Sequence, residues 1–180
     1  MLACVVQKSL SSKPEKIVPV DPLEEAYNFC ETGEYEKALK CYDKVLQKDP
    51  DNTRALIDKG VTLQNLGQVK ESLLLYGRAL ELEPKNTGAM LNKGSALHTL
   101  KRYTEAIRCY DDVLKLDKKN TMAFAYKGLS LAELGEVEEA LEYFKRALEL
   151  DKYYDLANIS IEKAKEILKS YKKLTQASLD

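Results

Sequence analysis

The sequence has no tryptophan and only one histidine, His98, among its 180 residues. Its four cysteines, Cys4, Cys30, Cys41 and Cys109, include no pair with the Cys-x-x-Cys spacing of zinc sites and redox motifs. One histidine and four scattered thiols do not match any usual structural zinc site. We therefore expect no bound metal, and we expect the cysteines to be reduced thiols.

Long apolar stretches and an excess of one charge are also absent. No run approaches the roughly 20 apolar residues that a membrane helix requires. Lys and Arg total 28 against 29 Asp and Glu, so the net charge is -1 with both signs interspersed. Such a chain creates no field that attracts nucleic acid or anionic lipid. We expect a cytoplasmic globular protein with neither a nucleic-acid partner nor a membrane partner.

Catalytic patterns are missing as well. The sequence contains no GxxxxGK, HExxH or EF-hand pattern. No Ser, Cys or carboxylate is paired with His98 at a recurring spacing. The acidic pairs Asp111-Asp112 and Glu138-Glu139 are most simply explained as parts of solvent-exposed helix faces. We therefore predict a protein that is not an enzyme, with no catalytic residues and no cofactor.

What the sequence does contain is a fixed period. Gly60, Gly94 and Gly128 are each 34 residues apart, although a glycine inside a helix costs about 1 kcal/mol relative to alanine. Two other sets keep the same step: the aromatic residues Tyr42, Tyr76, Tyr110 and Phe144, and the small residues Ala38, Ser72, Ala106 and Ala140. A fixed period of this length is typical of a solenoid built from repeated units.

Each period carries the signals of two helices. Good N-cap residues precede the first helix: Asn52, Asn86 and Asn120. A glycine near the middle fits the left-handed conformation that ends a helix: Gly33, Gly67 and Gly135. Lys101 stands at this position in the third period, where we expect either a small strain cost or a different turn.

These signals predict four helix pairs followed by one more helix. The pairs are expected at 22–32 and 36–48, 53–66 and 70–82, 87–100 and 104–116, and 121–134 and 138–150. A last helix, rich in Lys and Glu, is expected at 153–173, where it would cover the apolar face that the fourth pair leaves open. Residues 1–18 lack the period and are expected to form a flexible tail.

The pattern resembles the tetratricopeptide repeat, a 34-residue helix–turn–helix unit with Gly or Ala in the first helix, Ala in the second, an aromatic residue four positions later and Pro at the end. The usual tryptophan of the first helix is replaced here by Pro22, Leu56, Met90 and Phe124. The resemblance implies an all-α fold, a right-handed superhelical solenoid of antiparallel helix pairs. Four repeats would cover residues 19–152 (about 19–52, 53–86, 87–120 and 121–154), and a C-terminal capping helix and tail would cover residues 153–180.

The repeat offers a reason for the glycines inside the first helices. We expect them to face small residues of the second helix, where any side chain would push the paired helices apart. The facing pairs would be Gly60 with Ser72, Gly94 with Ala106 and Gly128 with Ala140.

In this family the first helices line a concave groove that accepts a peptide or a helix of a partner. Carried over position by position, the resemblance implies a groove formed by Leu23, Tyr27, Arg54, Ile57, Asp58, Val61, Leu91, Asn92, Ser95, His98, Met122, Tyr126 and Leu129. The alternative is that some of the apolar members pack between neighbouring first helices and never contact a ligand.

One subgroup of the family binds the acidic C-terminal tails of heat-shock chaperones through Lys, Asn and Arg side chains on three first helices. The corresponding positions here hold no cation: Leu23, Tyr27, Asp58, Gly88 and Asn92. When the clamp positions are compared with the chain one repeat further along, only Asn92 matches. We therefore expect no carboxylate clamp for such a tail.

Together these observations indicate a non-enzymatic protein–protein interaction scaffold that binds a hydrophobic or mixed peptide or helix in its groove. The alternative is a structural subunit of a homo-oligomer or larger complex. In that case a neighbouring chain would fill the groove, or the chain's own N-terminal tail would do so through its apolar residues 2–6.

Overall fold

The computed structural model describes residues 21–177, with side chains described as far as residue 169. Over this range the chain forms nine helices and no strand. The helices are α1 (Pro22–Glu31), α2 (Tyr35–Lys48), α3 (Thr53–Asn65), α4 (Val69–Leu82), α5 (Thr87–Thr99), α6 (Tyr103–Leu116), α7 (Thr121–Glu133), α8 (Val137–Leu150) and α9 (Asp155–Ala177). The predicted tail at residues 1–18 and the apolar segment 2–6 lie outside the described residues.

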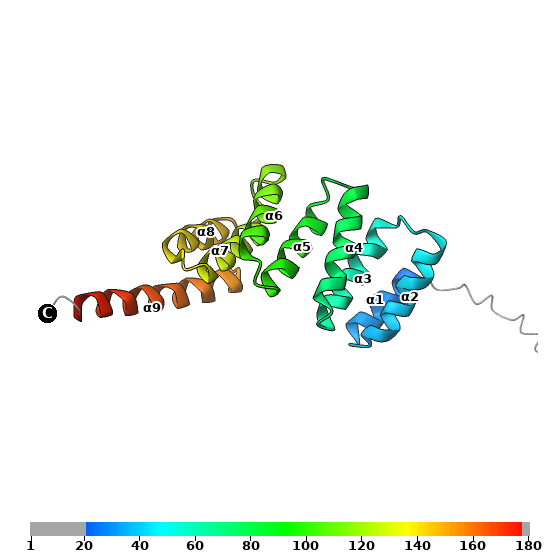
Figure 1. Ribbon diagram of the computed structural model, residues 1–180, viewed down its shortest axis with the longest axis horizontal. Coiled ribbons are helices and arrows are strands. Elements are labelled where there is room, and N and C mark those ends of the chain that lie inside the picture. The colour runs from blue at the N-terminus through cyan, green and yellow to red at the C-terminus, as the bar shows by residue number, and fades with distance from the viewer. Residues whose placement is uncertain (1–20, 178–180) are drawn as a thin grey trace, which may run out of the picture.

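The helices stack as antiparallel pairs along the long axis of the molecule, and the C-terminal end of α9 extends beyond the stack (Figure 1). Each of α3, α5 and α7 contacts the next first helix in the row, and α9 continues that row by packing on both α7 and α8. No comparable contact joins consecutive second helices among the described elements. The first helices therefore line the inner side of the curve, and the predicted all-α solenoid is confirmed.

The beginnings of the first helices follow from their N-cap asparagines. The side-chain oxygen of Asn52 accepts the backbone N–H of Ala55 at 3.0 Å, and Asn86 and Asn120 make the same bond at 2.9 Å. Each asparagine also donates its amide N–H to a carboxylate three residues earlier, on Asp49, Glu83 or Asp117. These bonds satisfy helix-terminal donors and fix the turn between consecutive pairs.

The turn inside each pair needs a residue with positive φ. Gly33, Gly67 and Gly135 adopt φ of 75°, 77° and 87°, as predicted from their spacing. Lys101 adopts φ of 60° in the third pair, so the same turn is built there with a side chain in the left-handed region. The expected strain at Lys101 is therefore present, because a Cβ atom is disfavoured in this conformation.

The atoms nearest to the glycines inside the first helices belong to aromatic rings of the second helices, and not to the small residues that we expected from the sequence. A Cβ atom built on Gly94 would lie 2.5 Å from Cε1 and 2.8 Å from Cζ of Tyr110, closer than to any atom of Ala106. Gly60 and Gly128 have the same relation to Tyr76 and Phe144. Each ring is almost fully buried and rests directly on the glycine backbone. The glycines therefore make room for an aromatic ring of the second helix.

Ion pairs reinforce two of the joints between consecutive pairs. The Lys127 ammonium, in α7, lies 2.6 Å from Asp111 in α6 and 4.3 Å from the centroid of the Tyr143 ring. Burial lowers the pKa of Lys127, but the hydrogen bonds to Asp111 and Tyr143 outweigh this effect and raise it overall. Lys59 and Asp43 form the matching pair at 2.5 Å two repeats earlier.

Replacing Gly94 by leucine tests the glycine–ring contact. We expect Gly94→Leu to lower the free energy of unfolding by about 1–3 kcal/mol, because the buried Tyr110 ring has no space to move. Gly77, in α4, is a matched control, since nothing lies within 4 Å of a Cβ atom built there. Urea denaturation should show no loss of stability for Gly77→Leu; equal losses in both variants would contradict the account.

Candidate interaction groove

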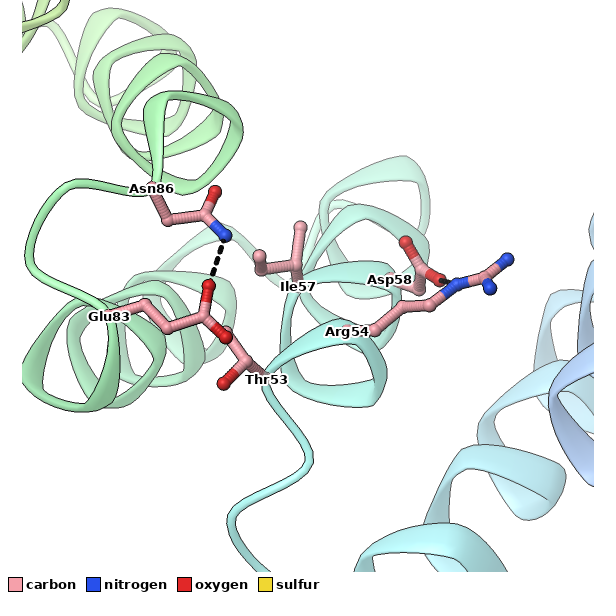
Figure 2. Close-up of a pocket in the computed structure, with 6 residues that line it drawn as sticks. All are labelled: Thr53, Arg54, Ile57, Asp58, Glu83 and Asn86. Atoms are coloured by element: carbon pink, nitrogen blue, oxygen red, sulfur yellow. Dashed lines mark hydrogen bonds and ion pairs between the residues drawn. The ribbon is translucent and has the colours of Figure 1, made fainter. Parts of the chain in front are cut away.

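The N-terminal part of α3 and the turn between α4 and α5 enclose a shallow pocket of about 220 Å³, lined by Thr53, Arg54, Ile57, Asp58, Glu83 and Asn86. Figure 2 shows Ile57 between two polar pairs. On one side Arg54 Nε lies 3.6 Å from Asp58 Oδ2, and on the other Asn86 donates to Glu83 at 2.8 Å. Burial raises the pKa of Asp58, and the pairing with Arg54 opposes this.

Three large apolar side chains on the predicted groove positions are exposed. Tyr27 on α1 is 58% exposed, Val61 on α3 is 36% exposed and Met122 on α7 is 42% exposed. Tyr27 and Val61 occupy equivalent positions in consecutive repeats. Leu23 and Ile57 lie beside them and are half-buried. The groove thus presents apolar surface on several first helices.

Some of the predicted groove residues pack against the hydrophobic core and expose little or only part of their side chains. Leu91 is only 8% exposed and belongs to the core around Tyr110, so it offers little surface to a ligand; this corrects the expectation from its position. Tyr126 is half-buried, with its ring centroid 5.9 Å from that of Tyr110. Leu129 is half-buried against the core around Phe144. Asn92 is half-buried on α5.

Polar side chains connect neighbouring first helices. The Cys30 Sγ lies 3.4 Å from Thr62 Oγ1, which joins α1 to α3. Gln64 donates to Ser95 Oγ at 3.1 Å, which joins α3 to α5. His98 and Ser130 complete the series between α5 and α7, as described next. Ser95 and His98, predicted as ligand contacts, therefore have partners inside the protein.

His98 is the residue closest to a catalytic arrangement. Its Nδ1 lies 2.9 Å from Ser130 Oγ, and its ring stands edge-on to Tyr103 at 5.1 Å. Burial lowers the pKa of His98, while the nearby Glu133 carboxylate, which accepts a hydrogen bond from Tyr103 at 3.3 Å, opposes this. Ser130 is fully buried, so a substrate has no access to its hydroxyl. The arrangement therefore supports the helix contact and not a nucleophile.

A second cleft, of about 270 Å³, lies between α7 and α9 and is lined by Leu129, Ala132, Glu133, Phe144, Ser160, Lys163, Ala164 and Ile167. The part that α9 takes in this cleft was not predicted from the sequence. A signal was available, because Ala157 follows the buried Ala123 by one full period and Asp155 follows Thr121 by the same step. Glu83 and Asn86 were missed for a different reason: they belong to a turn that approaches α3 only in the fold.

Over the residues that the structure describes, no group of three or more His, Cys, Asp or Glu side chains is arranged to hold a metal ion. No described helix combines the length and the apolar character needed to cross a membrane. Cys30, Cys41 and Cys109 carry free thiols.

Antiparallel helix pairs that stack in one row, with the first helices in contact with one another, define a helical-repeat protein. Proteins of this class serve as protein–protein interaction scaffolds. Two family profiles match the sequence: "Psidin, N-terminal TPR repeats region" over residues 22–123 and "Tetratricopeptide repeat" over residues 102–155. The chain belongs to the tetratricopeptide-repeat family. Proteins of this family are generally non-enzymatic. A comparison with curated proteins gives no match.

Solved structures of the same fold are similar over most of the chain. MamA protein is 23% identical, with a TM-score of 0.70, covering 81% of this chain and 79% of that chain. YrrB, a TPR protein with an unusual peptide-binding site, is 23% identical, with a TM-score of 0.66 and coverage of 84% and 78%. The first TPR of Spaghetti (RPAP3), bound to the HSP90 peptide SRMEEVD, is 25% identical, with a TM-score of 0.62 and coverage of 67% and 95%.

The joint between α5 and α7 should respond to pH. Because the folded-state pKa of His98 lies below its ordinary value of 6.5, the unfolded chain binds this proton first as the pH falls. The stability is unaffected well above pH 6.5 and decreases as the pH drops through and below that value. We expect the loss between pH 7.5 and 5.5 to be smaller in His98→Asn, whose amide can still bond Ser130. Urea denaturation at both pH values measures the free energy of unfolding of the wild type and the variant. An equal loss of stability in the two proteins would refute a role for His98 titration.

Proposed function

We propose that this protein is a non-enzymatic scaffold that binds a hydrophobic or mixed peptide or helix of a partner protein in its concave groove. The observation that carries the proposal is the exposure of Tyr27, Val61 and Met122 on three inner helices. Large apolar side chains gathered in a concavity mark interaction sites more often than single exposed ones do. The Spaghetti domain is bound to a peptide and YrrB has a peptide-binding site, and both properties belong to those proteins. Their similarity to this chain supports the proposal of a peptide-binding groove here.

The charges of the groove favour a partner that is not acidic. The exposed or half-buried charged residues at the inner positions of α1, α3 and α7 are Glu24, Glu31, Arg54, Asp58 and Glu133. The one cation among these, Arg54, already pairs with Asp58. A carboxylate-rich tail would meet repulsion and no clamp. The proposed partner segment is therefore apolar and neutral or basic.

A structural role remains the second candidate. In it the groove is occupied by a neighbouring copy of the chain or by residues 2–6, and the protein is a subunit of a homo-oligomer or a larger complex. Size-exclusion chromatography with light scattering over a hundredfold range of concentration tests the homo-oligomeric form of this role, because only that form predicts a stable oligomer without added partner. We place the protein in a reducing, cytoplasmic environment, which its free thiols favour.

Charge introduced into the groove should abolish partner binding. We expect Tyr27→Asp and Val61→Asp to lose proteins that the wild type retains in a quantitative affinity purification, because a carboxylate in the apolar contact must be desolvated. Leu74→Asp is the matched control, since Leu74 is an exposed leucine on the second helix α4. Circular dichroism verifies that all three variants are folded. Retention of every partner by the two groove variants would refute the assignment.

The absence of a clamp predicts no affinity for an acidic chaperone tail. Isothermal titration with the peptide SRMEEVD, the sequence bound by the Spaghetti domain, should give no binding heat at millimolar peptide. The Spaghetti domain itself serves as the positive control. A micromolar dissociation constant for this chain would contradict the proposed charge preference.

A further inference from the structure

The row α1, α3, α5, α7 and α9 contains four joints, by which we mean the contacts between consecutive helices of the row. One residue position distinguishes the last joint from the other three. Cys30, Gln64 and His98 occupy the same position in consecutive repeats, and each extends from its own helix to a polar side chain on the next. Ala132 occupies this position in α7. A methyl group cannot make such a polar contact, so no equivalent bridge joins α7 to α9 from this position. Ala132 lines the cleft of about 270 Å³ between these two helices.

The cleft suits an apolar group. Its walls include Leu129, Ala132, Phe144, Ala164 and Ile167, with Ser160 also among the lining residues. A cavity of about 150 Å³ is enough to hold benzene in another protein, so this cleft has room for a leucine, methionine or phenylalanine side chain. It adjoins the inner surface through Leu129, which stands on α7 at the position that Val61 has on α3.

Charged groups stand on two sides of the cleft. Glu133, which is exposed, comes from α7, and Lys163, also exposed, comes from α9. Glu133 adds to the acidic inner positions Glu24, Glu31 and Asp58 described above. The Glu133 carboxylate on α7 therefore favours a cation next to the apolar group, whereas the Lys163 ammonium on α9 favours an anion at its own position.

We propose that the cleft between α7 and α9 is an anchor pocket for one bulky apolar side chain of the partner segment, with a Lys or Arg beside it that pairs with Glu133. This proposal rests on the proposed function, because it names a subsite of the same groove. The occupant is an amphipathic, basic segment of another protein. The pocket adds specificity to a groove in which the other first helices are bridged by polar side chains.

Two blocked dipeptides, acetyl-Phe-Lys-amide and acetyl-Phe-Glu-amide, test the pocket by methyl NMR titration of the full-length chain. We expect both to shift the methyl signals of Ala132 and Ala164, and the lysine probe to bind about two- to fivefold more tightly. Ala132→Gln, which restores the longer side chain of the other joints, should abolish these shifts. Glu133→Gln should remove the preference for lysine. Thr99→Gln, on an exposed position of α5, should change neither.

The outcomes separate the pocket from the groove as a whole. Shifts near Tyr27 and Val61 without shifts at Ala132 and Ala164 would overturn the pocket and leave the proposed function standing. Shifts at neither place would also overturn the pocket. Shifts at Ala132 and Ala164 support it even if Val61→Asp retains every partner. Nuclear Overhauser contacts from Val5 or Val6 to Ala132 in the free protein would overturn it too, because the chain itself would then be the occupant.

Discussion

The contact between a bare glycine backbone and an aromatic ring governs the geometry of this protein. In three helix pairs the ring of Tyr76, Tyr110 or Phe144 occupies the space that a Cβ atom would need. The helical cost of each glycine is offset by burial of a complete ring, which is among the largest apolar contributions a side chain makes. Because the contact recurs at the same position of each of these repeats, the same pair geometry recurs, and stacked pairs of equal geometry produce a solenoid.

The groove follows from that stacking. Paired helices placed at regular intervals leave the first helices in one inner row, where their side chains either join neighbouring helices or remain open to a partner. Gln64 and His98 do the first, and Tyr27 and Val61 do the second. The scaffold is therefore fixed before binding, which reduces the ordering cost of association. Under the proposed function, local differences between repeats, such as Ala132, decide where a partner is held.

Features set by local signals could be predicted from the sequence, and features set by packing could not. The N-caps, the positive-φ turns and the strained Lys101 depend on a few neighbouring residues, and all are present. The rotation of one helix against another decides that the Tyr110 ring lies nearest to Gly94, and that Leu91 is buried. No local pattern records that rotation. The role of α9 in the groove wall depends on the same long-range packing.

The central claim is that the inner row of helices, and not the outer row, contacts the partner. Site-specific photo-crosslinking in cells tests it most directly, with benzoylphenylalanine placed at Tyr27 on α1 or at Leu74 on α4, both of which are exposed. The account predicts partner crosslinks from the Tyr27 position and none from the Leu74 position. Crosslinks to the same partner from Leu74 alone would contradict it.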